Sequence, residues 1–279
     1  MKKLLLSMTL ALVALASYAT GQVSDVIYID GTKWELLGSP VSTDSVLRRE
    51  LGASLPKERG ISTANWNGYT AYWSIRQKEL CLDSITYEVY DGSSPQGKTE
   101  SLASDVLLRV FKRYADKKGR IVAAWFNGDI RVARGKVLYY EHSGYERNYE
   151  TEQILTIKKG AVCNRKEYNN YVVDGFSFDK GTPNFQAEIH EKFPLHIERY
   201  PELAGVKRIM FSVKKARVDA QGHLVECEVK VLRPDDNPRL AAEMAEAMKA
   251  YSPWRVFCIN GEYRALGIEH YTIPYVLSE

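Results

Sequence analysis

Residues 208–232, which read RIMFSVKKARVDAQGHLVECEVKVL, decide the fold of the C-terminal part of the chain. Apolar and β-branched residues recur through two runs, and the segment DAQG at residues 219–222 separates them. Two such runs around a short turn are typical of a β-hairpin. We therefore expect antiparallel strands over residues 208–218 and 224–232.

Beyond this hairpin, a short amphipathic helix and a second pair of strands are expected. Apolar residues follow at helical spacing, at Leu240, Met244, Ala247, Met248 and Tyr251. Ser252-Pro253 ends the helix, and residues 254–258 resume an extended pattern. Asn260-Gly261 is a strong hairpin signal, after which residues 263–276 are expected to form one long strand. The predicted order is β-β-α-β-β.

This order and several short motifs resemble the C-terminal domain of the TonB family. The motifs are Tyr200-Pro201, the turn at 219–222, VKVLR at 229–233, Ser252-Pro253-Trp254, Asn260-Gly261 and YTIP at 271–274. The resemblance covers residues 200–279, which is the size of one small domain. It implies a TonB C-terminal-like module, found in energy transducers and in proteins of other kinds, and it implies no reaction and no cofactor.

The start of the chain has the pattern of a cleaved signal peptide over residues 1–21. Lys2 and Lys3 are basic, residues 4–16 are apolar, and small residues follow at Ser17 and Ala19. Cleavage after Ala19 and cleavage after Gly21 both fit this pattern. Because the apolar run is too short to span a bilayer as a helix, we expect a periplasmic or secreted protein with no stable membrane span after cleavage.

The charge of the exported chain argues against nucleic acid as a partner. The full chain has 38 basic and 35 acidic residues, so removal of Lys2 and Lys3 leaves 36 against 35 and lowers the formal charge from +3 to +1. Nucleic-acid-binding domains have a clear basic excess. With 45% apolar residues, the chain is instead expected to form a globular α+β protein of two domains.

The first domain, residues 25–192, is expected to be a mostly antiparallel β meander of unknown function with one helix. Asp30-Gly31 indicates a hairpin between residues 26–29 and 34–37. Apolar residues predict a helix over 101–117, and four further strands are expected at 121–126, 129–133, 137–142 and 150–158. Residues 164–192 lose this periodicity and are interpreted as the connection to the last domain.

Aromatic residues in this domain suggest either a core or a recognition platform. They include Trp66, Tyr69, Tyr72, Trp73 and Trp125. Alternation along residues 69–75 places Tyr69 and Trp73 on one face of a strand, where we expect core, and Tyr72 on the other. Tyr72 is therefore the candidate recognition aromatic. WNGY at 66–69, WFNG at 125–128 and the segment 135–149 also resemble exported proteins of Bacteroidetes-type bacteria, a resemblance that implies no activity.

The chemistry-bearing residues form no recognised catalytic or metal motif. His190 and His196 are six residues apart with Pro194 between them, whereas a helical zinc site needs histidines one turn apart. Glu141, His142, Glu146, Glu150 and Glu152 suggest either an acid-base site or a solvated face. The four cysteines match no metal motif, and Cys227 and Cys258 are expected to be buried thiols, with a disulfide between them as the alternative.

We therefore expect a non-catalytic envelope protein that binds another envelope protein or an extended peptide segment. Pro274 cannot donate a ladder hydrogen bond, which favours an edge position for the last strand. The resemblance to TonB domains implies β-strand addition there, and we assign the peptide-binding edge to Tyr263, Arg264, Glu269, His270 and Tyr271. Arg264 and Glu269 equally suit an edge that is protected from pairing. A TonB-type energy transducer and an envelope hydrolase are the alternative functions.

Overall fold

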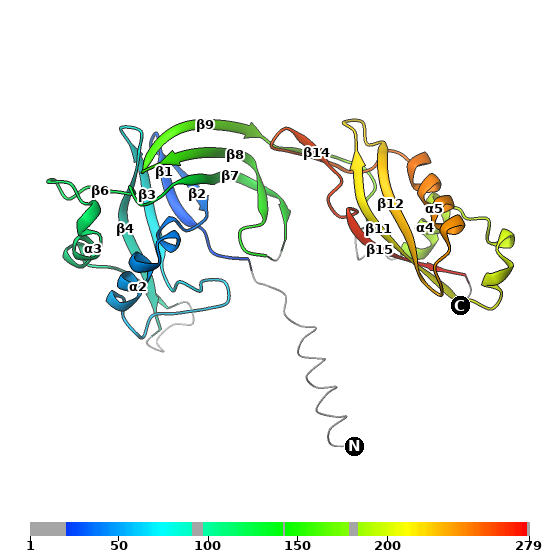
Figure 1. Ribbon diagram of the computed structural model, residues 1–279, viewed down its shortest axis with the longest axis horizontal. Coiled ribbons are helices and arrows are strands. Elements are labelled where there is room, and N and C mark those ends of the chain that lie inside the picture. The colour runs from blue at the N-terminus through cyan, green and yellow to red at the C-terminus, as the bar shows by residue number, and fades with distance from the viewer. Residues whose placement is uncertain (1–20, 91–96, 142, 179–183, 278–279) are drawn as a thin grey trace, which may run out of the picture. The chain divides into compact units, whose positions relative to one another are not determined.

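The computed structural model describes residues 21–90, 97–141, 143–178 and 184–277. The chain forms two compact units that divide between Asn169 and Asn170. Both units combine helices with more extensive β-structure (Figure 1), which confirms the mixed α+β class with mostly sheet. The predicted signal peptide, residues 1–21, lies outside the described residues except for Gly21. Within those ranges, no helix is long and apolar enough to cross a membrane.

Unit 1 is built on one large sheet. Its strands are β1 (Asp25–Ile29), β2 (Thr32–Leu37), β3 (Thr70–Arg76), β4 (Glu79–Val89), β5 (Lys98–Ser101), β6 (Ile121–Val122), β7 (Gly128–Tyr140), β8 (Arg147–Lys158) and β9 (Ala161–Asn169). The sheet order β3-β1-β2-β7-β8-β9-β4 returns to β3, because β4 pairs with both β9 and β3. The pairs are antiparallel except for β1 with β3.

Two helices cover part of this sheet and complete its core. They are α2 (Ser45–Ser54) and α3 (Ser104–Val110), and the 3-10 turns Pro40–Thr43 and Lys112–Tyr114 accompany them. Leu51 of α2 and Phe111 after α3 are fully buried in the same cluster as Trp73. Tyr69 and Trp73 are buried at 6% and 0% exposure, which confirms both as core residues.

The meander prediction needs several corrections. The strand expected over residues 121–126 is limited to β6, and the helix expected over 101–117 is shortened to α3 and a 3-10 turn. The long strand β7 contains Gly135, because a bulge between Arg134 and Val137 absorbs that glycine without ending the strand. Residues 164–169 were expected to belong to the connection between the domains. They instead form the second half of strand β9, which pairs with residues 151–158 of β8. Helix α2 was not predicted, since Leu47 and Leu51 are its only buried residues and its apolar periodicity is weak.

Unit 2 contains two three-stranded sheets. Its elements are β10 (Tyr171–Val173), α4 (Phe185–Lys192), the 3-10 turns Ile197–Arg199 and Pro201–Leu203, β11 (Arg208–Val218), β12 (Leu224–Arg233), α5 (Pro238–Ala250), β13 (Val256–Ile259), β14 (Glu262–Arg264) and β15 (His270–Val276). The sheet orders are β12-β11-β15 and β10-β13-β14. The predicted hairpin β11–β12 and the following helix are confirmed.

The core of unit 2 lies between helices and the β12-β11-β15 sheet (Figure 1). Leu240, Met244 and Met248 of α5 are fully buried with Val231 and Trp254, as the helical spacing predicted. Ile189 and Phe193 from the region of α4 belong to the same core. For this reason the division at Asn169 lies well ahead of the boundary expected between residues 192 and 200.

The prediction of one long C-terminal strand over residues 263–276 is wrong. This segment is divided into β14 and β15, which belong to different sheets. Ala265 and Ile268 between them are buried at 1% and 2% exposure, and the Ile268 amide donates to the Ala265 carbonyl in a turn. Burial of these two side chains in the unit 2 core therefore interrupts the strand.

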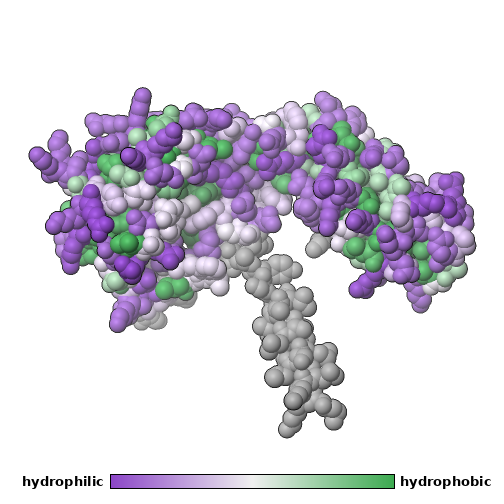
Figure 2. Space-filling model, viewed as in Figure 1, coloured by the Kyte–Doolittle hydropathy of each residue, from purple (hydrophilic) through white to green (hydrophobic). Residues whose placement is uncertain are grey.

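The surface of each unit is typical of a globular domain. On the face of each unit shown in Figure 2, hydrophilic residues predominate and hydrophobic residues form small, separate patches.

The cysteines are free thiols, with Cys81 and Cys258 buried, Cys227 partly buried and Cys163 exposed. Thus Cys227 and Cys258, which lie on strands of different sheets, form no disulfide.

Candidate functional site

The outer edge of β15 carries backbone groups that face away from its own sheet. The Leu277 amide donates to the Lys207 carbonyl over 2.8 Å, and the β11–β15 register continues from there without a shift. Because peptide groups alternate in direction along an antiparallel strand, those of Tyr271, Ile273 and Tyr275 point toward β11. Those of His270, Thr272, Pro274 and Val276 point outward.

Gln186 of α4 occupies part of this outer edge. Its side-chain Nε2 donates to the Pro274 carbonyl over 2.9 Å, and its Oε1 accepts from the Val276 amide over 3.0 Å. One amide thus bridges two outward-facing groups in the way that one residue of a parallel neighbouring strand does. The outward groups of His270 and Thr272 have no hydrogen-bond partner among the described residues. Two residues of β15 therefore remain open to a further strand.

The structure separates the five residues assigned to a peptide-binding edge. Tyr263 and Arg264 lie in β14, at the edge of the β10-β13-β14 sheet, whereas His270 and Tyr271 lie in β15. Glu269 lies in the turn between the two strands. Tyr271 points inward and stacks on Phe178 with ring centroids 4.7 Å apart. Only the backbone of His270, together with Thr272, which was not predicted, forms the open part of the edge.

The edge around Tyr263 has a different character. Tyr171, Cys258 and Tyr263 are directly opposite one another across β10, β13 and β14. Hydrogen bonds with Cys258 and Tyr263 raise the pKa of Tyr171 to about 12. Arg264 is paired with Glu262 over 3.0 Å. Strand β14 has only three residues, so it presents a shorter edge than β15.

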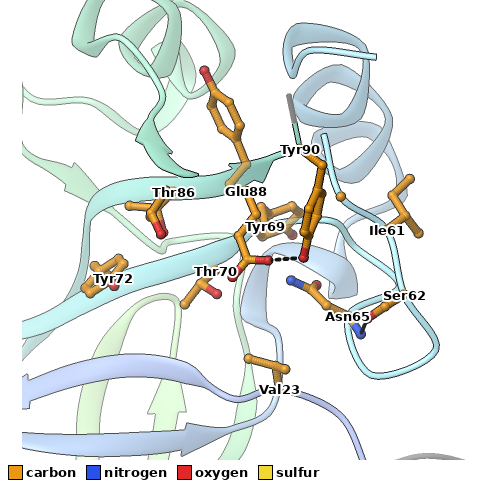
Figure 3. Close-up of a pocket in the computed structure, with 13 residues that line it drawn as sticks. Val23, Ile61, Ser62, Asn65, Tyr69, Thr70, Tyr72, Thr86, Glu88 and Tyr90 are labelled. Carbon is orange, nitrogen blue, oxygen red and sulfur yellow. Dashed lines mark hydrogen bonds between the residues drawn. The ribbon is translucent and has the colours of Figure 1, made fainter. Parts of the chain in front are cut away.

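Tyr72 lines a pocket of about 370 Å³ on unit 1. Thr70 and Tyr72 come from β3, and Thr86 and Glu88 from β4, with Thr70 directly opposite Thr86. Figure 3 shows these side chains in a row that ends at Tyr90, whose hydroxyl donates to Glu88 Oε2 over 2.7 Å. Alternation along β3 thus places Tyr72 outside the core, in a hollow that the sequence did not reveal.

The side chain of Tyr90 packs against two glycines. A Cβ on Gly60 would lie 2.3 Å from the Tyr90 ring, and one on Gly97 would lie 3.0 Å from it. The ring therefore packs directly on glycine backbone at both positions, although it is 52% exposed. Close packing of this kind limits the rotamers of the ring and forms one wall of the pocket.

The histidines considered for zinc have other partners. His196 Nδ1 lies 2.9 Å from Glu243 Oε1, and its backbone amide donates to the same oxygen. The His190 ring packs on Tyr275, with centroids 4.1 Å apart. Over the described ranges, no group of three or more His, Cys, Asp or Glu side chains is arranged to hold a metal ion.

The glutamates considered for acid-base chemistry are also held separately. Glu150 accepts from the Lys136 amide over 2.8 Å, whereas Glu152 is fully buried and accepts from the Tyr149 amide and the Asn148 side chain. Glu141 and Glu146 lie in the turn after β7, and His142 lies outside the described residues. The described members of this cluster therefore do not converge on a shared pocket.

Asp25 is a buried acid that sequence reasoning missed. Its Oδ1 accepts from the Ala71 amide over 3.0 Å and its Oδ2 from Trp73 Nε1 over 3.1 Å. Desolvation outweighs these two hydrogen bonds and raises the pKa of Asp25 from 3.8 to about 7. The sequence contains no local signal for this burial, because the donors are more than 40 residues away.

Comparison with known proteins identifies no relative: no family model matches the chain, and no curated protein or solved structure is significantly similar to it. Function is therefore inferred from the residues described above.

Proposed function

We propose that this protein is an exported, non-catalytic protein of the cell envelope that binds an extended segment of another envelope protein. The segment adds as a strand beside β15. The observation that carries the proposal is the outward-facing backbone of His270 and Thr272 at the end of the β12-β11-β15 sheet. Unpaired groups on an exposed strand edge are the usual template for β-strand addition.

The arrangement of unit 2 supports a TonB C-terminal-like module. A hairpin, a covering helix and a final strand beside the first strand of the hairpin occur in that order. Two of the motifs that carry the resemblance have structural roles: Tyr200 is buried and donates to Glu243 over 2.6 Å, and Trp254 is fully buried. Strands β13 and β14 do not join the β12-β11-β15 sheet, because β13 pairs with β10 and β14 pairs with β13.

The hydrogen bonds of Gln186 show that the outer edge of β15 binds an amide group. Its side chain already makes a donor and an acceptor bond with β15, so the geometry of this edge suits a peptide group. An incoming strand that pairs with His270 and Thr272 would end where Gln186 begins. The module thus favours a short pairing segment, and side chains next to it would supply the selectivity.

We expect substitution Thr272→Pro to abolish peptide binding while Thr272→Val retains it. Proline removes the outward N–H and places its ring at the edge, whereas valine keeps the backbone donor and suits a strand. Neither change removes a bond to β11, because the peptide groups of residue 272 point outward. Linear peptides selected by display on the wild-type protein provide the ligand. Their affinity for the three proteins is measured by calorimetry, and amide shifts of residues 270–276 locate the site. Equal affinity for both variants would exclude this edge.

We expect Gln186→Ala to strengthen binding of the same peptides by about three- to tenfold, the equivalent of one net hydrogen bond. The substitution frees the Pro274 carbonyl and the Val276 amide, and the open edge then extends over four residues instead of two. Gln186→Glu is the matched control, because it keeps the size of the side chain but removes the donor to Pro274. Weaker binding by Gln186→Ala would show that the helix contributes to the site instead of limiting it.

A further inference from the structure

We infer that the pocket beside Tyr72 in unit 1 binds a neutral carbohydrate. This site is independent of the β15 edge, since all of its residues belong to unit 1. Its volume of about 370 Å³ lies at the lower end of the range for small-molecule sites. Four properties of the lining residues lead to this ligand class.

The first property is the placement of two tyrosine rings. Tyr72 and Tyr90 lie at opposite ends of the row of residues in Figure 3, with Thr70 and Thr86 between them. A sugar ring has a face of C–H groups that packs on an aromatic side chain, while its hydroxyl groups project from the rim. Two rings that are separated by a polar strip suit such a ligand better than a cage of converging aromatics would.

The second property is the supply of hydrogen-bonding groups without partners. The hydroxyl groups of Thr70, Tyr72 and Thr86 have no bond to any described residue. Each hydroxyl both donates and accepts, as sugar hydroxyls do. Glu88 accepts from Tyr90 through Oε2, which leaves Oε1 to accept from a ligand hydroxyl. The strip therefore offers donors and acceptors of the kind that a polyhydroxylated molecule pairs with.

The third property is charge. Of the described residues that line the pocket, Glu88 alone is charged. Phosphate- and carboxylate-bearing ligands are most strongly bound by Arg and Lys, and the described lining contains neither. A negative ligand would also approach the Glu88 carboxylate. Anionic ligands are therefore disfavoured, and a neutral ligand is favoured.

The fourth property is the state of the backbone beneath the pocket. Strand β3 is paired with β1 on one side and β4 on the other, and β4 is paired with β5 at Thr86 and Glu88. The backbone of β4 at Thr86 is thus paired on both sides and offers no open edge to an extended peptide, so strand addition does not apply to this strand. Recognition must come from side chains, which agrees with a small hydroxylated ligand.

The test is a titration of the isotope-labelled full chain with four neutral disaccharides: cellobiose, maltose, lactose and N,N′-diacetylchitobiose. We expect at least one of them, at up to about 10 mM, to shift the amides of Thr70, Tyr72, Thr86 and Glu88 in a saturable way. Tyr72→Ala is expected to weaken that binding about tenfold, because it removes the stacking surface. Thr86→Val, which keeps the side-chain shape and removes the hydroxyl, is expected to weaken it less.

Tyr28→Ala is the matched control. Tyr28 is 41% exposed on the neighbouring strand β1 but does not line the pocket, so its removal is expected to leave the affinity unchanged. Choline chloride tests the alternative that the tyrosines and Glu88 hold a cation. The inference is overturned if none of the four sugars gives saturable shifts, if choline alone binds, or if Tyr72→Ala and Tyr28→Ala bind the sugar equally. Because peptide binding is measured at β15, failure here leaves that proposal standing.

Discussion

Replacing Trp254 with alanine is expected to destabilise unit 2 by about 3–5 kcal/mol, the usual cost of truncating a buried tryptophan. Trp254 is fully buried and stacks on Phe193 with ring centroids 5.4 Å apart and an interplanar angle of 8°. Phe176, Phe178 and Tyr251 pack their edges against it. Small domains have a free energy of unfolding of about 5–15 kcal/mol, so this single loss would remove a large part of it.

The backbone of Trp254 is held as tightly as its ring. Its amide donates to the Gly222 carbonyl over 2.8 Å, and a Cβ on Gly175 would lie 2.4 Å from its carbonyl carbon. Its Nε1 donates to the Met248 carbonyl over 3.1 Å. The residue therefore connects the β11–β12 turn, the end of α5 and the segment before α4. The cavity left by alanine would have little freedom to collapse.

Hydrogen exchange resolved by unit is the appropriate measurement, because a two-unit chain need not unfold in one step. We expect loss of protection in β11, β12, β15 and α5 of Trp254→Ala, with protection in unit 1 unchanged. Trp254→Phe keeps a ring on Phe193 and loses the Nε1 hydrogen bond. We expect the lost bond to cost about 1 kcal/mol, with a further cost because phenylalanine buries less apolar area than tryptophan. Equal loss of protection in both units would contradict the division of the core.

The second large effect concerns Asp25, whose burial is expected to make unit 1 lose stability as the pH rises. The folded protein holds the proton of this carboxyl up to a pKa of about 7, whereas the unfolded chain releases it near 3.8. Between these values the folded state binds more protons, so the free energy of unfolding falls with pH. The contribution is fully present below about pH 3.8 and fully lost above about pH 7. Its total size is on the order of 4 kcal/mol.

Urea unfolding at pH 5 and pH 8, followed by tryptophan fluorescence, measures this effect. Four of the five tryptophans lie in unit 1, so the signal reports mainly on that unit. Asp25→Asn cannot titrate and is expected to lose the pH dependence that the wild type shows over this range, whatever its own stability. Asp105→Asn, which changes an acid whose side chain is 78% exposed, is the control and should retain it. A wild-type stability that is flat or rises from pH 5 to pH 8 would contradict the assignment.

Local sequence signals correctly placed the elements that depend on neighbours in the chain. Asp30 and Gly31 both adopt positive φ angles, which a tight hairpin turn between β1 and β2 requires. The turn at residues 219–222 joins β11 to β12, and the apolar spacing at Leu240, Met244 and Met248 matches the buried face of α5. In each case the turn geometry or helical period is a property of a few consecutive residues.

Predictions failed where a distant contact overrides the local pattern. Residues 263–276 read as one strand, yet burial of Ala265 and Ile268 breaks them into β14 and β15. Gly135 was expected to lie in a turn, but it lies within β7, in a bulge of the pairing with β8. Residues 170–192 lack periodicity, although Phe178 and Ile189 are core residues of unit 2. Such side chains are buried by partners that sequence spacing does not reveal.

For the two candidate sites, the sequence by itself determined the direction of single residues. Alternation placed Tyr72 on the other face of the strand from Tyr69 and Trp73. The missing N–H of Pro274 predicted that its strand lies at the edge of a sheet, and β15 is such an edge strand. Only the tertiary structure decided what surrounds them: the wall that Tyr90 forms next to the pocket, and the Gln186 amide that covers half of the β15 edge. The physical reason is that backbone direction follows from local geometry, whereas a pocket or an occupied edge requires groups that are brought together across tens of residues.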